Sequence, residues 1–225
     1  MTDTVTMLGV RGSIPQSGAD YIRYGGSTVC VLVRLAGETL VLDAGSGMTK
    51  LPAFLRPEET QLSLLLSHPH LDHLLGFLMC PICVNPDYTL RVYGAVREGL
   101  SVAEQFARLM APPIWPVRPQ DLAAKISFCD LTEHAEIGAV RVDTIEGAHP
   151  GGARVIRLRG NGKAIVFATD ITLGGEMTDR LADFARNCDM LIIDGQYTDA
   201  EWEKFCNFGH TTYTAAARFG KLCGA

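Results

Sequence analysis

The sequence lacks two features that would place it at a membrane or send it out of the cell. None of its 225 residues belongs to an apolar run long enough to span a bilayer. The N-terminus reads Met-Thr-Asp-Thr, without the basic start and apolar run of a signal peptide. We therefore expect a cytoplasmic protein that does not bind a membrane.

The sequence also has no excess of positively charged residues. Lys and Arg number 20 against 25 Asp and Glu, which gives a formal net charge of −5. General nucleic-acid binders are usually basic, so we do not expect nucleic acid as a partner. Small anionic molecules stay possible ligands, because a bound metal supplies positive charge locally.

Cysteine is not arranged as a disulfide framework. The seven cysteines are an odd, scattered number, which suits reduced thiols in the cytoplasm. Cys80 and Cys83 have the spacing of a zinc knuckle, but no second pair follows. We therefore interpret them as packing residues.

Histidine is scarce, yet three of the six histidines lie close together. His68, His70 and His73 fall within six residues, and Asp72 lies between them. Residues 62–67 just before them are apolar and predict a buried strand that ends in this turn. Imidazole and carboxylate suit zinc first, and manganese or iron as alternatives. The alternative interpretation is a solvated turn or a helix cap.

The spacing within this turn favours two ions. His68 and His70 are two residues apart, so they point the same way on an extended segment, and Pro69 disfavours helix at His68. Asp72 and His73 fall where the chain turns towards an apolar helix. Two ions about 3.5–4 Å apart are typical of a hydrolytic site.

Three more residues further along the chain are candidates for the same chemistry. His149 is followed by proline and flanked by glycines, which let the backbone approach an ion. Asp170 ends a buried strand, where a carboxylate is costly without a cation. His210 is a candidate for catalysis or substrate contact, or else for a helix cap. Asp194 we expect to be structural, hydrogen-bonded to residues 209–212.

The turn His-x-His-x-Asp-His resembles the signature of the metallo-β-lactamase superfamily. Residues 7–15, 24–30, 40–47, 147–150, 167–170, 194–198 and 209–212 resemble further loops of its phosphodiesterase-like branch, which includes tRNase Z. This resemblance implies an α/β chain folded as a four-layer αββα sandwich. It also places Ser13, Gly25, Gly26 and Ser27 in loops near the metals.

The resemblance also implies roles. His68, His70 and His149 would hold one metal ion, Asp72 and His73 a second, and Asp170 would bridge both in a dinuclear site. Asp43 would orient a ligand histidine, Asp72 would align the attacking water, and His210 would donate a proton to the leaving group.

The family has one more histidine ligand beyond residues 209–212, whereas this sequence reaches Ala225 without one. We therefore expect either an incomplete chain lacking the last strand and helix, or a second ion that is one ligand short.

The function implied is that of a metal-dependent hydrolase, a phosphodiesterase acting on a small or nucleotide-like phosphoester. An endoribonuclease like tRNase Z and a non-catalytic metal- or ligand-sensing module are the alternatives. The expected partner is a small-molecule phosphoester, and a homodimer stays open.

The organisation predicted is one domain, residues 1–225, with an insertion at 97–119. Four prolines in residues 111–119 make that stretch stiff, and Trp115 either faces the substrate from a lid or packs on the core. Arg154, Arg157, Arg159 and Lys163 form a basic strip, interpreted as a solvated edge strand rather than an anion site. We expect strands at 4–9, 29–35, 39–42, 62–67, 89–94, 139–145, 154–159, 164–168 and 190–193, and helices at 48–55, 97–110, 178–187 (with Thr178 as N-cap), 199–205 and 212–222.

Overall fold

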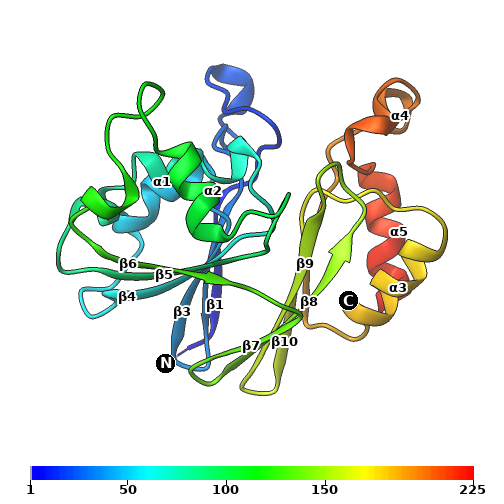
Figure 1. Cartoon of the computed structure of the whole chain (residues 1–225). Coiled ribbons are helices and arrows are strands. Elements are labelled where there is room, and N and C mark those ends of the chain that lie inside the picture. The colour runs from blue at the N-terminus through cyan, green and yellow to red at the C-terminus, as the bar shows by residue number, and fades with distance from the viewer. Residues whose placement is uncertain (1) are drawn as a thin grey trace. The chain divides into compact units, whose positions relative to one another are not determined.

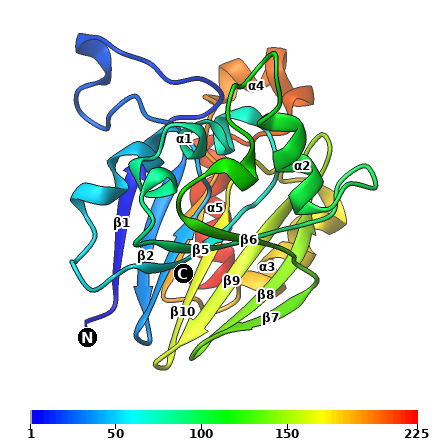
Figure 2. The same cartoon turned by 60° about the vertical axis from the view of Figure 1, so that its left-hand side comes forward.

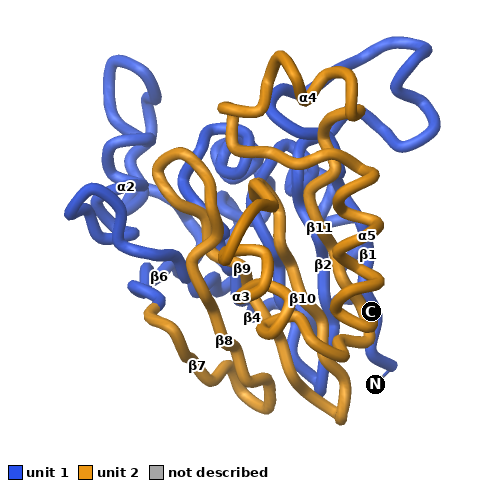
Figure 3. Tube along the Cα trace, turned by 90° about the vertical axis from the view of Figure 1, so that its right-hand side faces the viewer, with its two compact units in different colours: residues 1–131 blue, residues 132–225 orange. Residues whose placement is uncertain are grey.

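A computed structural model describes residues 2–225, which form two compact units. The first unit ends at Leu131 and the second runs from Thr132 to Ala225, as the colours in Figure 3 show. Each unit has its own sheet, helices and apolar core (Figure 1).

The first unit is built on a six-stranded sheet in which the strands follow one another in sequence order. The first three strands are antiparallel and the last three join in parallel. Ala36 and Gly37, both at positive φ, form the tight turn of the hairpin between β2 and β3. The strands are β1 (Thr4–Gly9), β2 (Cys30–Leu35), β3 (Glu38–Leu42), β4 (Gln61–Leu65), β5 (Thr89–Gly94) and β6 (Lys125–Asp130).

Short helices cover this sheet and supply the rest of its core. In α2 (Val102–Leu109) the side chains of Val102 and Phe106 are buried, and Ser101 and Glu104 form a capping box at its start. The other α-helix is α1 (Leu75–Leu78), and the 3₁₀ helices are η1 (Ala19–Tyr21), η2 (Ser46–Ala53), η3 (Leu71–His73), η4 (Pro81–Val84) and η5 (Pro119–Asp121).

The segment expected as an insertion is only partly helical. Its helix begins at Val102 rather than at residue 97, because Arg97 pairs with Leu100 in a tight turn before it. Trp115 packs, partly buried, against the core of the first unit. This contact favours the core interpretation of Trp115 over the lid.

The second unit is built on a five-stranded sheet with the order β11-β10-β9-β8-β7. Figure 2 shows β10, β9, β8 and β7 side by side in this order. Only β10 and β11 are parallel. The strands are β7 (His134–Ile137), β8 (Val140–Gly147), β9 (Ala153–Gly160), β10 (Lys163–Ala168) and β11 (Met190–Ile193); the helices are α3 (Gly175–Ala185), α4 (Asp199–Phe205), η6 (Cys206–Phe208) and α5 (Tyr213–Cys223).

Two local expectations for the second unit are wrong. Helix α3 begins three residues before Thr178, and its N-cap is Gly174 rather than Thr178. The arginine-bearing β9 is not an edge strand, because it lies between β8 and β10.

Residues 2–225 contain no helix that is both long enough and apolar enough to cross a bilayer. All seven cysteines are free thiols, and Cys80 and Cys83 are buried in the core of the first unit. That position agrees with their interpretation as packing residues.

An ion pair fastens the 54–59 loop to the sheet of the first unit. The carboxylate of Glu59, which is 7% exposed, accepts hydrogen bonds from the Arg34 guanidinium, the Thr39 hydroxyl and the Arg56 N–H. The bond from Arg34 holds the pKa of Glu59 at about 2, below its ordinary value of 4.5. The carboxylate therefore stabilises the fold at neutral pH, and this contribution fades as the pH falls from 4.5 towards 2.

We expect Glu59→Gln to lower the free energy of unfolding at pH 7 by roughly 2–3 kcal/mol. The difference from the wild type should shrink steadily below pH 4.5, and urea unfolding at several pH values measures it. Glu58→Gln, at the exposed neighbouring position, is the matched control and should change little. A destabilisation by Glu59→Gln that does not depend on pH would contradict this account.

Candidate metal centre

The turn after β4 brings the three clustered histidines together in the first unit. The ring of His68 lies 4.4 Å from that of His70 and 4.3 Å from that of His73, measured between centroids. His68 and His73 are buried and His70 is exposed. The 3₁₀ helix η3 begins just after His70, and this tight turn returns His73 to the other two rings. His68, His70, Asp72 and His73 are called the first donor set below.

Asp43 fixes the orientation of this set from the end of β3. Its carboxylate accepts hydrogen bonds from the Ser67 N–H and hydroxyl at 2.7 Å each, and it lies 2.7 Å from His73 Nδ1. Asp43 is fully buried and has a φ of 56°, a left-handed conformation that aspartate tolerates better than most residues. The expected hydrogen bond between Asp43 and a histidine of the motif is present, with the carboxylate as acceptor.

Asp72 is held from two sides. Its Oδ2 accepts a hydrogen bond from the Ser13 N–H at 3.0 Å, and its carbonyl oxygen accepts one from the Thr28 hydroxyl at 2.7 Å. The backbone packs so closely here that a Cβ at Gly45 would lie 2.5 Å from the Asp72 carbonyl oxygen. A glycine is therefore required for this approach.

The second unit holds His149 and Asp170, called the second donor set below. His149 follows β8 and Asp170 follows β10, and the His149 Nε2 lies 3.9 Å from the Asp170 Oδ2. The side chains are 2% and 8% exposed. Asp170 has a φ of 52°, so both Asp43 and Asp170 end their strands in the left-handed conformation, a strain typical of functional sites.

His149 is oriented by the loop that follows η6. Its Nδ1 lies 2.8 Å from the carbonyl oxygen of Gly209. A Cβ at Gly209 would lie 2.4 Å from the same Nδ1, and the φ of Gly209 is +86°. Only glycine at this position allows the loop to hold the imidazole.

His210 lies next to the second donor set. Its Nδ1 is 2.8 Å from Asp194 Oδ2 and 4.0 Å from Asp170 Oδ2, and its ring lies 5.4 Å from that of His149. Asp194 also accepts hydrogen bonds from the N–H groups of Ile171 and Gln196. Asp194 therefore ties the 209–212 loop to the end of β11, in the structural role predicted for it.

The donor chemistry of both sets fits a divalent metal. His73 and His149 each have Nδ1 engaged with an oxygen, so an ion would be bound through Nε2, as is usual for ligand histidines. His73 Nε2 lies 3.3 Å from Asp72 Oδ2. Two atoms bound to one tetrahedral zinc at about 2.0–2.1 Å are separated by about that distance. Asp170, Asp194 and His210 also lie close enough to one another to share an ion.

Sequence reasoning missed several residues that support the site. Ser67 holds Asp43 and also lies, through its hydroxyl, 2.9 Å from His68 Nδ1. A polar residue at the end of an apolar strand, directly before the first histidine, was the available signal. Thr28 gave no signal, because its contact with Asp72 joins residues 44 positions apart.

The basic strip does not gather at the site. Each of its side chains is paired, so it offers no anion-binding surface. Arg154 pairs with Glu146, Arg157 donates to the carbonyl groups of Phe184 and Arg186, Arg159 pairs with Asp143, and Lys163 pairs with Asp189.

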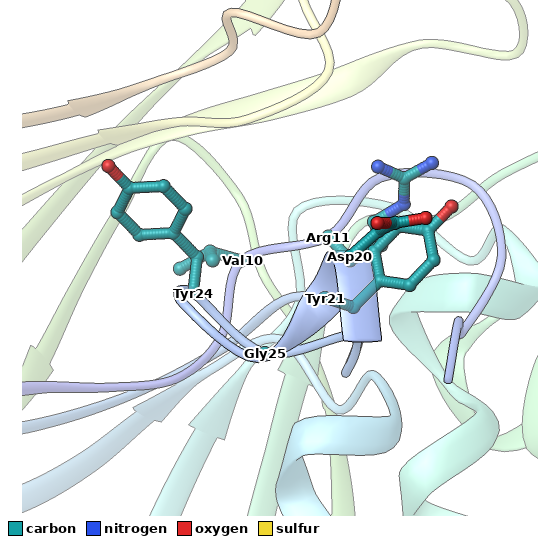
Figure 4. A pocket seen from close by; sticks show the side chains of 6 residues that line it. All are labelled: Val10, Arg11, Asp20, Tyr21, Tyr24 and Gly25. Carbon is teal, nitrogen blue, oxygen red and sulfur yellow. The ribbon is translucent and has the colours of Figure 1, made fainter. Parts of the chain in front are cut away.

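A pocket of about 320 Å³ lies on the loop that joins β1 to β2. Its lining is polar and aromatic, and its side chains are drawn in Figure 4. The lining residues are Val10, Arg11, Asp20, Tyr21, Tyr24 and Gly25.

Solved structures resemble the chain over nearly its whole length. It superposes on the metallo-β-lactamase fold protein YhfI of Bacillus subtilis with a TM-score of 0.73 and 22% identity, covering 98% of this chain and 81% of the other. The short form of human tRNase Z gives 0.72 and 20%, covering 100% and 90%. A diphosphatase of the PhnP family gives 0.69 and 14%, covering 100% and 84%. These similarities confirm the expected fold class, the αββα fold of the metallo-β-lactamases.

The comparison with curated proteins found no significant match. The family model described as the β-lactamase superfamily domain matches residues 38–225. That range contains both donor sets and more than half of the chain. The chain therefore belongs to the metallo-β-lactamase superfamily, as its His-x-His-x-Asp-His turn predicts.

Proposed function

We propose that the protein is a metal-dependent phosphodiesterase that hydrolyses a small or nucleotide-like phosphoester. In this proposal the first and second donor sets supply the ligands of one dinuclear centre, with zinc as the first choice of metal. The observation that carries the proposal is the pair of histidines with buried side chains, His73 and His149, whose Nδ1 atoms are held by oxygen partners. Such support is typical of histidines that bind a metal through Nε2.

Family relatives support the reaction type. The solved structures with a similar fold include a tRNase Z and a diphosphatase, and both names denote cleavage of phosphate esters or anhydrides. Divalent ions at the donor sets would supply Lewis-acid activation of water and of the phosphoryl group. The net charge of −5 favours a small ester over a long RNA, because RNA binding depends on many basic contacts.

The chain's own groups divide the remaining work. In this proposal Asp72, held by the Ser13 N–H, accepts a hydrogen bond from the attacking water and so directs it. In the same proposal His210, held by Asp194, donates a proton to the departing oxygen. Asp194 keeps the imidazole in one orientation throughout.

Hydrolysis of methyl p-nitrophenyl phosphate tests the proposal. We expect the metal-loaded protein to release p-nitrophenolate, a chelator to abolish the release, and zinc or manganese to restore it. Turnover should survive 0.5 M salt, because metal coordination of one phosphate depends little on ionic screening. If no divalent metal supports turnover of this or any other phosphodiester, the assignment as a phosphodiesterase is wrong.

A further inference from the structure

We propose that the β1–β2 loop pocket binds the planar base of a nucleotide, which makes the substrate a nucleotide ester. This proposal rests on the function proposed above and narrows its substrate class. The pocket is lined by residues between Val10 and Gly25. None of these residues belongs to the donor sets or to the proposed catalytic groups.

The pocket has the size and lining of a small-molecule site. Its volume of about 320 Å³ lies at the lower end of the range usual for such sites. Figure 4 shows the side chains of Arg11, Asp20 and Tyr21 gathered on one side, with the ring of Tyr24 extending on the other. Two tyrosines, one arginine and one aspartate are thus among the residues that line the pocket.

Aromatic and basic side chains alternate in this loop. The Arg11 guanidinium lies over the ring of Tyr21 at 5.2 Å, and that of Arg23 lies over the ring of Tyr24 at 5.0 Å. Tyr24 is 73% exposed. Exposed tyrosine rings and guanidinium planes are the groups on which nucleobases stack. Arg11 and Asp20 add a donor and an acceptor for the edge of a base.

The loop is fastened to the first donor set. The Ser13 N–H donates to Asp72, and Ser13 lies only two residues from Arg11, so their Cα atoms are at most about 7 Å apart. The base of the loop is also closed by hydrogen bonds from the Arg11 N–H to Ser27 and from the Gln16 N–H to Gly26. A phosphate at Asp72 and a ring in the pocket can therefore belong to one nucleotide.

A small planar ligand fits the lining better than a protein partner. Ile14 and Ile22 are also exposed on this loop, at 59% and 78%, but neither lines the pocket. The pocket itself is mostly polar and aromatic, which matches the hydrogen-bonding edge and flat faces of a base. Ile22→Ala is thus a matched control, since it changes an exposed apolar residue of the same loop.

Calorimetric titration of metal-stripped protein with adenosine 5′-monophosphate tests the pocket without turnover. We expect the nucleotide to bind at least 10-fold more tightly than ribose 5-phosphate, which lacks the base. Tyr24→Ala should weaken nucleotide binding about 10-fold and leave ribose 5-phosphate unchanged, while Ile22→Ala should match the wild type. Equal affinity for the two ligands, an unaffected Tyr24→Ala, or an Ile22→Ala as weak as Tyr24→Ala would overturn the proposal.

Steady-state kinetics with two esters test the base-binding pocket and the proposed hydrolase activity separately. With thymidine 5′-(p-nitrophenyl phosphate), Tyr24→Ala should raise KM about 10-fold and keep kcat, whereas methyl p-nitrophenyl phosphate should show no change. If neither ester is hydrolysed but Tyr24→Ala still weakens nucleotide binding, the proposed hydrolase activity is wrong and the proposed base-binding pocket is supported. If both esters are hydrolysed and Tyr24→Ala changes neither KM nor nucleotide binding, the proposed base-binding pocket is wrong and the proposed hydrolase activity is supported.

Discussion

Replacing His149 with alanine is expected to lower phosphodiester hydrolysis by on the order of 10³-fold. The imidazole is 2% exposed, its Nδ1 is held by the Gly209 carbonyl oxygen, and its Nε2 lies 3.9 Å from Asp170. Removing it takes a proposed ligand from the centre. A loss of about 4 kcal/mol of transition-state stabilisation corresponds to this factor. Initial rates with methyl p-nitrophenyl phosphate at saturating metal measure the effect.

His134→Ala is the matched control for this variant. His134 belongs to the same unit, but its side chain is 67% exposed and pairs with Asp143, which belongs to neither donor set. We expect its turnover to stay within about twofold of the wild type. Circular dichroism of both variants shows whether the fold is kept. A folded His149→Ala protein with wild-type turnover would remove His149 from the centre.

The second large effect concerns His210 and depends on the leaving group. A general acid contributes about 10²–10⁴-fold when the departing oxygen needs a proton. We therefore expect His210→Ala to lower kcat by about that factor with a thymidine dinucleotide, whose leaving group is an alcohol. With p-nitrophenolate as leaving group, which departs without a proton, the loss should be less than about fivefold.

Comparing the two substrates distinguishes proton donation from other roles of His210. His210 lies 4.0 Å from Asp170 through Nδ1, so its removal could also disturb the second donor set. In that case both substrates would lose the same factor. Asp194→Asn leaves the His210 imidazole in place but weakens its partner, which also accepts from the Ile171 and Gln196 N–H groups. This variant should give a smaller loss with the same dependence on leaving group. Equal losses on both substrates would contradict the proton-donor role.

Much of the fold followed from sequence pattern. The strands Thr4–Gly9, Thr89–Gly94 and Met190–Ile193 and the helix Asp199–Phe205 have the predicted bounds. They are short, apolar or alternating, and flanked by polar turns, so local signals suffice. β6 and β7 were missed because they bury few side chains. None of the six residues of β6 is buried, and in β7 only Ile137 is.

Helix starts were less predictable. Helix α3 begins at Gly175, after a glycine N-cap that has no side chain to mark it. Thr178, a good capping residue by type, lies inside the helix instead. By contrast Thr212 caps α5 through its hydroxyl, which accepts from the Ala215 N–H, close to the predicted start. The sequence therefore predicts the start of a helix only where a side chain, and not a glycine backbone, forms the N-cap.

The residues of the candidate site were also predictable only in part. The first donor set is contiguous in sequence, so the turn itself revealed it. The groups that orient it, Ser13 and Thr28, act across 59 and 44 residues, and sequence spacing alone cannot show such contacts. The pocket around Tyr21 and Tyr24 was missed for another reason. Tyrosines in a glycine-rich loop have no periodicity, and only the folded loop brings them to Arg11 and Asp20.

The proposed dinuclear metal centre requires ligands from both donor sets. Elemental analysis of the purified wild type beside His70→Ala and His149→Ala tests it most directly. We predict about two zinc, manganese or iron ions per wild-type chain, and a clear loss of bound metal in each variant. Full metal content in either folded variant, or none in the wild type, would contradict the proposed dinuclear centre.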